Sequence, residues 1–278
     1  MKYLLGMVLS LGVTFSGAFA QSYLIRPNGV VLTIDAKGFM YNLNQFILPY
    51  MVTTKGGQFY INDKRQITTI DEDGFFYRID KKEFEAPRKV DFSGANYFSD
   101  KDSVWTIDRK GVMYQEKEIK DLGRVEKTGG RFFTVKPRRG DGLLYTISDF
   151  GKVERMIVDG LNPNDVAATG GCWFTTTNGD LYTLDSTGLV SRYGGSLFPR
   201  GTKITKAGGN YLFTNRGLIT INAKGEVSLV AFGTAQPQSM GYNYFTVSDN
   251  SLYVVDHLGA VWKNEAFGNL GSLGMTSL

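Results

Sequence analysis

Cysteine and histidine are almost absent from this sequence of 278 residues, which holds one of each, Cys172 and His257. A single cysteine excludes a disulfide framework within the chain and a cysteine-ligated zinc site. A single histidine excludes metal centres built from several histidines and leaves little scope for histidine acid–base chemistry. Proline is scarce as well, at 7 residues, and neither charge dominates, since 31 basic residues face 27 acidic ones. That balance gives no reason to expect binding to nucleic acid or to a membrane surface.

Glycine is abundant by contrast, with 34 residues in 278, or about 12% where about 7% is usual. An excess of glycine without an excess of proline indicates many tight turns. The chain is also 42% hydrophobic and 13% aromatic, which is too much for a disordered protein. Its length suits one large domain or two ordinary ones.

The first twenty residues have the pattern of a secretory signal peptide. Lys2 precedes an apolar stretch, and Ala18-Phe19-Ala20 is a small-x-small cleavage site. A transmembrane anchor is the competing interpretation, but polar residues interrupt the stretch, which is near the lower length limit for spanning. We therefore expect residues 1–20 to be cleaved after Ala20, and the mature protein, residues 21–278, to be periplasmic or secreted. No later segment predicts a membrane span.

The rest of the chain repeats one unit. Each copy has a Gly-Gly pair or its equivalent, two aromatic residues, a variable polar loop, a line like Leu-Tyr-Thr-Ile-Asp, two residues, a glycine and a short apolar segment. The clearest copy runs from Gly170 to Tyr193. The glycine after the aspartate recurs every 34 to 40 residues, at Gly38, Gly74, Gly111, Gly151, Gly188, Gly225 and Gly259. The copies fill residues 21–278 as a single domain and leave no room for a second one.

Each complete copy predicts four β-strands and two tight turns. Segments such as 30–35 and 181–186 are rich in β-branched and aromatic residues, which suit strands. In the Asp-x-x-Gly turn, the aspartate is expected to bond its own backbone and the glycine to adopt a positive φ. The Gly-Gly pairs predict two-residue hairpin turns, again with positive φ.

We predict an all-β protein, a seven-bladed β-propeller of four-stranded antiparallel blades. Consecutive aromatics on the second strand, such as Phe132 and Phe133, point to opposite faces, and a propeller blade is buried on both faces by its neighbours. A β-sandwich would need one polar face, and a solenoid would need polar caps that neither terminus supplies. The first copy lacks a first strand. We expect residues 270–278 to supply it, so that N- and C-terminal strands close the ring.

The line Gly-Gly-x-aromatic-aromatic, a variable loop, then Leu-Tyr-Thr-Leu-Asp-x-x-Gly-x-Val resembles the repeat of PQQ-like propellers over nearly all of residues 21–278. That class includes quinoprotein dehydrogenases and the propeller lipoprotein of the bacterial outer-membrane assembly machinery. Its repeats usually end the fourth strand with tryptophan, as Trp262 does here, whereas Tyr41, Tyr77 and Tyr114 take that place in three copies. The resemblance implies the fold. It implies no cofactor, because the sequence holds no calcium-and-quinone constellation.

One face of the predicted propeller is the better candidate for binding. Because neighbouring strands run in opposite directions, the two kinds of glycine turn share one face, here called the turn face, and the longer loops share the other, the loop face. Binding residues usually lie on variable loops of a rigid scaffold. The most basic loop spans residues 136–142, for which a plain solvated hairpin tip is the alternative. The candidate binding residues are Lys64, Arg65, Lys136, Arg138, Arg139, Asp141 and Arg216.

No catalytic residue, cofactor site or metal site follows from the sequence. His257 lies in a predicted turn, without the Gly-x-Ser-x-Gly elbow of a hydrolase. Cys172 is interpreted as a small strand residue. Residues 71–74 resemble the start of a calcium loop but lack the later ligands of an EF-hand. No phosphate-binding loop or nucleic-acid motif is present.

Two functional hypotheses remain open. The first is an exported, non-enzymatic binding or scaffold propeller, expected to be monomeric, that engages a protein or envelope polymer through the loop face. Under this hypothesis the protein binds no nucleic acid and has no segment that spans a membrane. The second is an enzyme or lectin that acts on carbohydrate at the central funnel, where Asp91 and Glu126 are expected near the inner strands.

Overall fold

The computed structural model describes residues 22–25, 30–47, 52–79, 84–100, 103–116, 124–137, 139–194, 198–233, 237–249 and 251–264. Within these ranges the regular structure is almost entirely strand, with one short 3-10 helix, η1 (Pro163–Asp165). None of the helical structure described there is long and apolar enough to cross a membrane. The predicted all-β class is therefore confirmed.

The strands form antiparallel sheets in which each strand pairs with its neighbours in the chain. The first sheet contains β1 (Ser22–Ile25), β2 (Val30–Ile34) and β3 (Met40–Ile47). The second, third and fourth sheets contain β4 (Val52–Lys55), β5 (Phe59–Asn62), β6 (Ile67–Ile70), β7 (Phe76–Arg78), β8 (Phe92–Ser93), β9 (Tyr97–Ser99), β10 (Val104–Ile107), β11 (Met113–Glu116), β12 (Arg124–Thr128), β13 (Phe132–Lys136), β14 (Leu143–Ile147) and β15 (Val153–Met156). The fifth, sixth and seventh sheets contain β16 (Val166–Thr169), β17 (Trp173–Thr176), β18 (Leu181–Leu184), β19 (Val190–Tyr193), β20 (Ile204–Ala207), β21 (Tyr211–Thr214), β22 (Gly217–Ile221), β23 (Val227–Val230), β24 (Pro237–Met240), β25 (Tyr244–Val247), β26 (Leu252–Val255) and β27 (Val261–Asn264).

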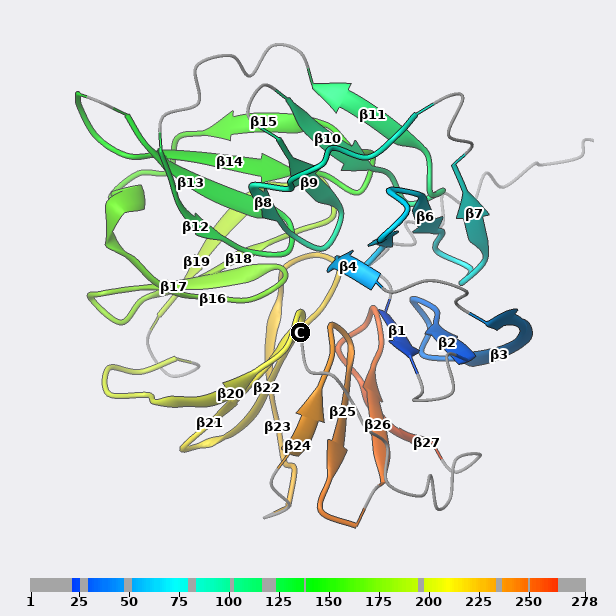
Figure 1. Cartoon of the computed structure of the whole chain (residues 1–278). Helices are drawn as coiled ribbons and strands as arrows, with labels where there is room; N and C mark the ends of the chain where they lie inside the picture. The colour runs from blue at the N-terminus through cyan, green and yellow to red at the C-terminus, as the bar shows by residue number, and fades with distance from the viewer. Residues whose placement is uncertain are drawn as a thin grey trace, which may run out of the picture.

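The sheets stand radially around a common centre, which is the arrangement of a β-propeller (Figure 1). The prediction of seven four-stranded blades is wrong in number, because the described residues form six four-stranded sheets. The first sheet has three strands there, since the described chain enters it at the strand that corresponds to the second strand of the other blades. The segment predicted to complete it, residues 270–278, lies outside the described residues.

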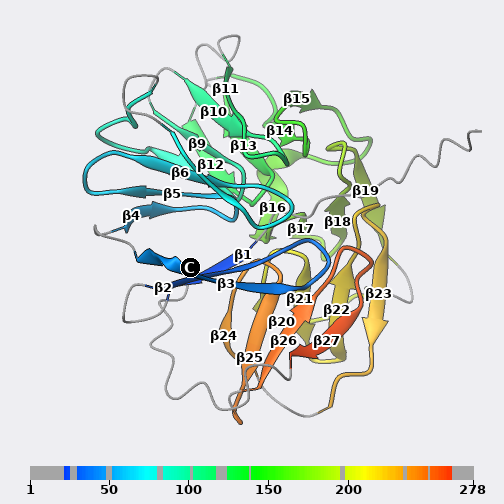
Figure 2. The ribbon, with the colours of Figure 1, turned by 90° about the vertical axis from the view of Figure 1, so that its right-hand side faces the viewer.

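The first sheet fills the gap between the second and seventh sheets in both views (Figure 2). The backbone N–H of His257, after β26, donates to the carbonyl of Ala36, after β2, at 3.0 Å. Leu32 of the first sheet shares a buried cluster with Val254 of the seventh. On the other side, the Tyr23 hydroxyl donates to the carbonyl of Phe59 at 3.0 Å. Contacts between the first and last sheets therefore bring the two ends of the described chain together.

The second strand of each complete blade is buried on both faces, as the paired aromatics predict. All four residues of β5, β17 and β25 are buried. Rings of these second strands also contact one another between blades, as do Phe132 of β13 and Phe174 of β17, whose centroids are 5.0 Å apart with the planes tilted by 52°. Burial of both faces explains why apolar and polar residues do not alternate along these strands, as in Trp173-Phe174-Thr175-Thr176 of β17.

The Asp-x-x-Gly turns have the predicted chemistry. In the second sheet, Oδ1 of Asp71 accepts the backbone N–H groups of Asp73 and Phe75 at 3.0 and 2.8 Å. Gly74 closes the turn with a φ of +84°. The other carboxylate oxygen of Asp71, Oδ2, accepts a hydrogen bond from the hydroxyl of Tyr77 at 2.7 Å. Tyr41, Tyr114 and Trp262 donate equivalent hydrogen bonds to Oδ2 of the aspartates in their own blades, so the aromatic near the start of the outer strand holds the turn carboxylate.

The Gly-Gly pairs do not have the predicted positive φ, and their glycines are required for a different reason. At Gly129, a Cβ would lie 2.1 Å from Cε1 of Phe132, whose ring covers the turn. The first glycine of the other turns meets the aromatic three residues later in the same way, as Gly170 meets Trp173. Close approach of a ring to the backbone, not left-handed geometry, therefore selects glycine at these turns.

Candidate functional site

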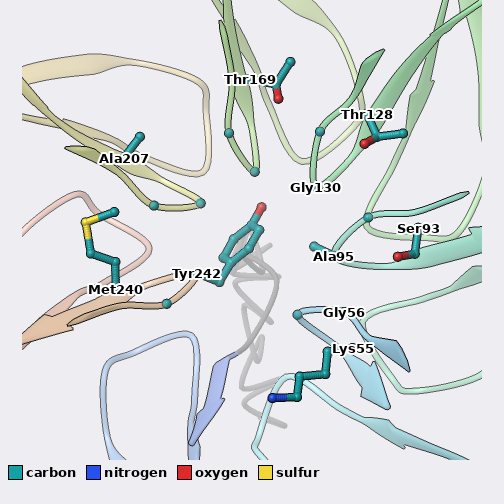
Figure 3. Close-up of a pocket in the computed structure, with 18 of the residues that line it drawn as sticks. Lys55, Gly56, Ser93, Ala95, Thr128, Gly130, Thr169, Ala207, Met240 and Tyr242 are labelled. Carbon is teal, nitrogen blue, oxygen red and sulfur yellow. The ribbon is translucent and has the colours of Figure 1, made fainter. Parts of the chain in front are cut away.

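A cavity of about 730 Å³ lies at the centre of the ring of blades. It is lined by the last residues of the inner strands β4, β8, β12, β16, β20 and β24 and by the glycine turns that follow them. Figure 3 shows these turns converging around the cavity, with the hydroxyl groups of Ser93, Thr128 and Thr169 pointing toward its centre. The volume falls in the range of small-molecule pockets.

Tyr242 reaches across the middle of this ring of turns (Figure 3). It takes the place of the second glycine in the turn of the seventh sheet, and its side chain is only 6% exposed. A Cβ on Gly209, Gly171 or Gly130 would lie 2.4, 2.3 or 2.8 Å from its ring. The second glycine of three other turns is therefore required because the ring of Tyr242 rests on it.

Backbone hydrogen bonds join these turns from blade to blade. The N–H of Gln58 donates to the carbonyl of Ala95 at 2.8 Å, and the N–H of Ala95 donates to Gly130 at 2.6 Å. The N–H of Cys172 donates to Gly209 at 3.0 Å, and that of Gly209 donates to Tyr242 at 2.7 Å. These bonds hold the cavity wall in a fixed shape, because each turn is positioned by the next.

The cavity is rich in hydrogen-bond donors. Lys55 and Lys206 line it together with the three hydroxyl groups and the amide of Gln238, and no carboxylate is among the described residues that line it. Burial lowers the pKa of Lys55, since desolvation disfavours its ammonium form. The ammonium of Lys206 donates to the carbonyl of Pro237. Among the described residues that line the cavity, the charged side chains are therefore Lys55 and Lys206.

A buried ion pair interacts with Tyr242 but does not line the cavity. Nη1 of Arg131 is 2.8 Å from Oδ1 of Asp149, and these side chains are 1% and 6% exposed. Neither lines the cavity, whereas Tyr242 lines it and also interacts electrostatically with both. Tyr242 thus links the cavity floor, which its ring forms, to the ion pair.

Burial raises the pKa of Asp149 to about 7, although the guanidinium groups of Arg131 and Arg109 oppose the shift. Arg131 also donates through Nη2 to the carbonyl of Asp185 in the next blade. The pair therefore joins the fourth and fifth sheets at the axis.

His257 lies in a turn, as the sequence predicts, whereas Cys172, interpreted from the sequence as a strand residue, lies in the turn just before β17. Cys172 is completely buried, with Sγ 3.6 Å from the carbonyl of Gly209, and burial raises the pKa of its thiol to about 12. At neutral pH this thiol is protonated and a poor nucleophile. His257 lies in the last Asp-x-x-Gly turn, where its backbone contacts Ala36 of the first sheet.

The two carboxylates of the carbohydrate hypothesis do not line the cavity. Asp91 is exposed and lies 3.1 Å from the ammonium of Lys89, and Glu126 is exposed and lies 3.5 Å from Nε of Arg124. Each carboxylate therefore has a neighbouring cation of its own. Among the residues that the structure describes, no group of three or more His, Cys, Asp or Glu side chains is placed to hold a metal ion.

The residues predicted to bind on the loop face are spread over three blades. Lys64 lies between β5 and β6, Lys136 and Arg139 lie at the loop between β13 and β14, and Arg216 lies between β21 and β22. All four side chains are exposed, as is that of Asp141 beside them. Arg138 lies outside the described residues.

Arg65 differs from the other candidates on the loop face. It has a φ of +60°, its Nε donates to the carbonyl of Ala86 at 2.7 Å, and its Nη1 lies 3.3 Å from Glu85. Arg65 therefore secures the connection between the second and third sheets. The loop of residues 136–142 borders a second cavity of about 450 Å³, lined by residues 141–144, 155–158 and 160–163.

Sequence reasoning missed the cavity lysines, the Tyr242 floor and the Arg131–Asp149 pair. Two of these left a signal in the repeat. Tyr242 replaces a glycine found in four equivalent turns, and Arg131 is charged where the equivalent residues are Gln58, Asn96, Cys172, Asn210 and Asn243. A buried residue that departs from the repeat therefore indicates a side chain whose contacts differ from those of its equivalents in the other blades.

No family model matches the chain, and no curated protein matches its sequence. Solved structures do match it at low identity. They include a streptogramin B lyase, at 14% identity and a TM-score of 0.36 over 91% of this chain and 96% of that one. A catalytically inactive virginiamycin B lyase from Staphylococcus aureus has 11% identity and a TM-score of 0.33 over 86% and 95% of the two chains. PorZ, a surface component of the type-IX secretion system of Porphyromonas gingivalis, has 9% identity and a TM-score of 0.38 over 89% of this chain and 38% of its own. Likenesses this distant assign no activity to the chain.

Proposed function

We propose that the protein is an exported, non-enzymatic binding propeller whose loop face holds an anionic surface of a protein or envelope polymer. One observation carries the proposal. Exposed basic side chains stand on loops of three different blades, at Lys64, Lys136, Arg139 and Arg216. Basic groups distributed in this way attract an extended anionic surface and contact it at several points.

Backbone hydrogen bonds on the turn face, opposite the loop face, support a scaffold role. Neighbouring turns there are joined by backbone hydrogen bonds, such as those from Arg109 to Asp149 at 2.7 Å and from Asp149 to Ser186 at 2.9 Å. Loops that project from a frame of this kind keep their relative positions. When a partner contacts several of these loops, little binding free energy is therefore lost in ordering them.

Export rests on the pattern of residues 1–20. Expression in a bacterial host with fractionation of the cells tests it. We expect a mature protein in the envelope or medium whose N-terminal residue is Gln21. A product that stays in the cytoplasm with Met1 would contradict export without affecting the binding proposal.

The binding proposal is tested by capture from an envelope extract, followed by measurement of affinity for the partner identified. The loop-face variant combines Lys64→Gln, Lys136→Gln, Arg139→Gln and Arg216→Gln. Its matched control is Lys37→Gln, Lys110→Gln, Lys152→Gln and Lys224→Gln, which neutralises the same number of charges on exposed lysines at turns of the turn face. Both variants lower the net charge, so a difference between them reports the surface and not the total charge.

We expect the loop-face variant to lose most of the captured partner and the control to retain it. Equal retention by both variants contradicts the proposal. A glycan array run alongside separates an envelope polymer from a protein. Turnover of any glycan, with release of shorter products, would favour the carbohydrate hypothesis instead.

A further inference from the structure

The turn face carries most of the exposed large apolar side chains. Within the part of the chain that the structure describes, these side chains lie at the Asp-x-x-Gly turns or their equivalents, with the exceptions of Ile157 and Leu229. Those next to the turn glycine are 46–69% exposed, and they are Phe39, Phe75, Val112, Phe150, Leu189 and Leu258. Those three residues past the glycine are 40–59% exposed, and they are Tyr41, Tyr77, Tyr114 and Trp262. Apolar side chains gathered on one face of a soluble protein mark an interaction surface.

A belt of backbone hydrogen bonds fixes these turns next to one another. From the second sheet round to the first, the second residue of each turn donates its N–H to the carbonyl of the second residue of the next turn. The residues joined in this order are Glu72, Arg109, Asp149, Ser186, Ala223, His257 and Ala36, at distances of 2.7–3.0 Å. The apolar side chains therefore project from a rigid ring of turns, and a contact through them costs little ordering of the backbone.

Apolar side chains of neighbouring blades adjoin one another on this ring. A Cβ on Gly74 would lie 3.3 Å from Cδ2 of Tyr41, so the ring of Tyr41 rests against the turn that carries Phe75. Tyr77 rests in the same way on Gly111 of the third sheet, where a Cβ would lie 3.1 Å away. The apolar surface therefore continues from one blade to the next.

The middle of the same face is polar. The Asp-x-x-Gly turns lead into the outer strands, whereas the Gly-Gly turns surround the central cavity, into which Ser93, Thr128 and Thr169 point their hydroxyl groups (Figure 3). A protein–protein interface has the reverse arrangement, with an apolar core inside a polar rim. A lipid bilayer is an extended surface that can take up separate apolar side chains around a ring, and tyrosine and tryptophan are enriched at its interface.

Exposed charges of both signs stand among the apolar side chains. The exposed lysines at the turns are Lys37, Lys110, Lys152 and Lys224. The exposed acidic residues there are Asp73, Glu226 and Glu154, and Glu154 pairs with Lys152. Zwitterionic phospholipid head groups also carry both signs, so each kind of side chain meets an opposite charge. Apolar contacts, and not a net charge, would then drive binding.

We propose that the turn face is a peripheral docking surface for a phospholipid bilayer. The side chains next to the turn glycines enter the boundary between head groups and acyl chains, and the tyrosines and Trp262 lie at head-group level. These rings donate to the turn aspartates, as Tyr77 does to Asp71, so they keep a hydrogen-bond partner when they leave water. The surface is opposite the loop face, and the inference does not rest on the partner proposed there.

Co-sedimentation with vesicles tests the inference. Vesicles of phosphatidylcholine are the main probe, and vesicles of phosphatidylcholine mixed with phosphatidylglycerol report any added attraction by charge. We expect the wild type to bind phosphatidylcholine vesicles with an affinity that changes little with salt, because salt screens charges and not apolar contacts. The loop-face variant should bind these vesicles equally well.

Two matched pairs of substitutions locate the contact. Leu189→Ser with Leu258→Ser removes two apolar side chains from the turns, and Ile157→Ser with Leu229→Ser removes two exposed ones elsewhere. We expect the first pair to weaken vesicle binding at least about ten-fold and the second pair to leave it unchanged. Adding Phe75→Ser to the first pair should weaken binding about ten-fold more. Thermal unfolding of each variant checks that the fold is retained.

The fluorescence of Trp262 reports which face meets the bilayer. Trp262 is 59% exposed on the turn face, whereas Trp173 is buried. Phosphatidylcholine brominated near the carbonyl end of its acyl chains should quench the tryptophan emission of the bound protein. Trp262→Phe should remove this quenching, because it removes the tryptophan that lies at head-group level.

Vesicle binding that persists in the loop-face variant, with quenching that depends on Trp262, supports the inference. Absence of binding to phosphatidylcholine vesicles overturns it, as does an equal loss of binding in the two matched pairs. Binding confined to the anionic vesicles and abolished in the loop-face variant also overturns it. Dimers that form without lipid and are lost with Leu189→Ser and Leu258→Ser, in a protein that binds no vesicles, would assign this face to a second copy of the chain instead.

Discussion

The Arg131–Asp149 pair is a buried ion pair whose two partners are expected to affect stability differently. Both side chains are buried, and they differ in one respect: a carboxyl can become neutral by binding a proton, whereas a guanidinium cannot lose one. Burial raises the pKa of Asp149 to about 7, so its neutral form is accessible near neutral pH. Removing one partner therefore has a different consequence from removing the other.

We expect Asp149→Ala to destabilise the protein by about 3–5 kcal/mol, because it leaves the charge of Arg131 buried without its partner. Arg131→Met should cost less, because Asp149 then takes up a proton. The double variant should be more stable than Asp149→Ala alone. Urea unfolding near neutral pH measures all three, and a larger loss for Arg131→Met than for Asp149→Ala would contradict this account.

The same carboxyl gives stability a defined pH dependence. Its pKa is about 7 in the folded protein and about 3.9 in an unfolded chain, so the folded state binds more protons between these values. The stability that this group contributes is therefore complete below about pH 4 and is lost as pH rises to about 7. The slope approaches about 1.4 kcal/mol per pH unit.

Unfolding free energies of the wild type and Asp149→Asn across that range check this prediction. Glu72, Asp185, Arg109, Arg131, Cys172 and Tyr242 all interact with Asp149, so the difference between the two proteins is the quantity to compare. We expect the unfolding free energy of the wild type minus that of Asp149→Asn to fall with rising pH. A difference that rises with pH, or stays flat, would show that Asp149 is ionised throughout.

At the scale of the element, two kinds of turn use glycine for two physical reasons. Gly111, in an Asp-x-x-Gly turn, has a φ of +78°, which disfavours any side chain. Gly129, in a Gly-Gly turn, has no positive φ but lies under the ring of Phe132. A side chain at Gly111 would therefore strain the backbone, whereas a side chain at Gly129 would clash with the ring of Phe132.

A double-mutant cycle separates these causes. Gly129→Ala should be strongly destabilising, and combining it with Phe132→Ala should cost less than the sum of the two, with a coupling of about 0.5–3 kcal/mol. At Gly111 the conformation itself is unfavourable, so Gly111→Ala combined with Phe132→Ala should be additive. Chemical denaturation gives each value. Additivity at Gly129 would contradict the steric explanation.

The sequence predicted the elements well where the information is local. The Asp-x-x-Gly turns follow from a carboxylate that bonds its own backbone, as Asp71 does, and from the positive φ of Gly74. The Gly-Gly turns were predicted at the right places with the wrong conformation. Their cause is a ring from the next strand, and the path of that ring over the backbone is not encoded in the dipeptide.

At the scale of the whole molecule, the repeat predicted the propeller but not what its blades place at the axis. Tyr242 lies against glycines of three other blades, and Arg131 pairs with a residue in the turn that ends β14. Lys55 and Lys206 line the same cavity only because the second and sixth sheets both face it. These contacts depend on how blades are placed around the ring, which no pattern within one copy reports.

Closure of the ring also belongs to this scale. The first sheet contacts the seventh through the backbone of His257 and Ala36, and residues 270–278 remain our prediction for its missing inner strand. Deleting residues 268–278 should therefore lower the melting temperature of the entire domain, because an uncovered strand edge weakens both neighbouring blades. A truncated protein that melts with the full chain would contradict this.

The central functional claim is that the molecule binds an anionic partner through basic groups on its loop face. The most direct measurement is the dissociation constant of the captured partner as a function of salt concentration, for the wild type, the loop-face variant and the turn-face control. Contacts between exposed charges weaken as salt screens them. We predict a steep loss of affinity with salt for the wild type and the control, and a weak, nearly salt-independent affinity for the loop-face variant. Identical salt dependence in all three proteins would contradict the account.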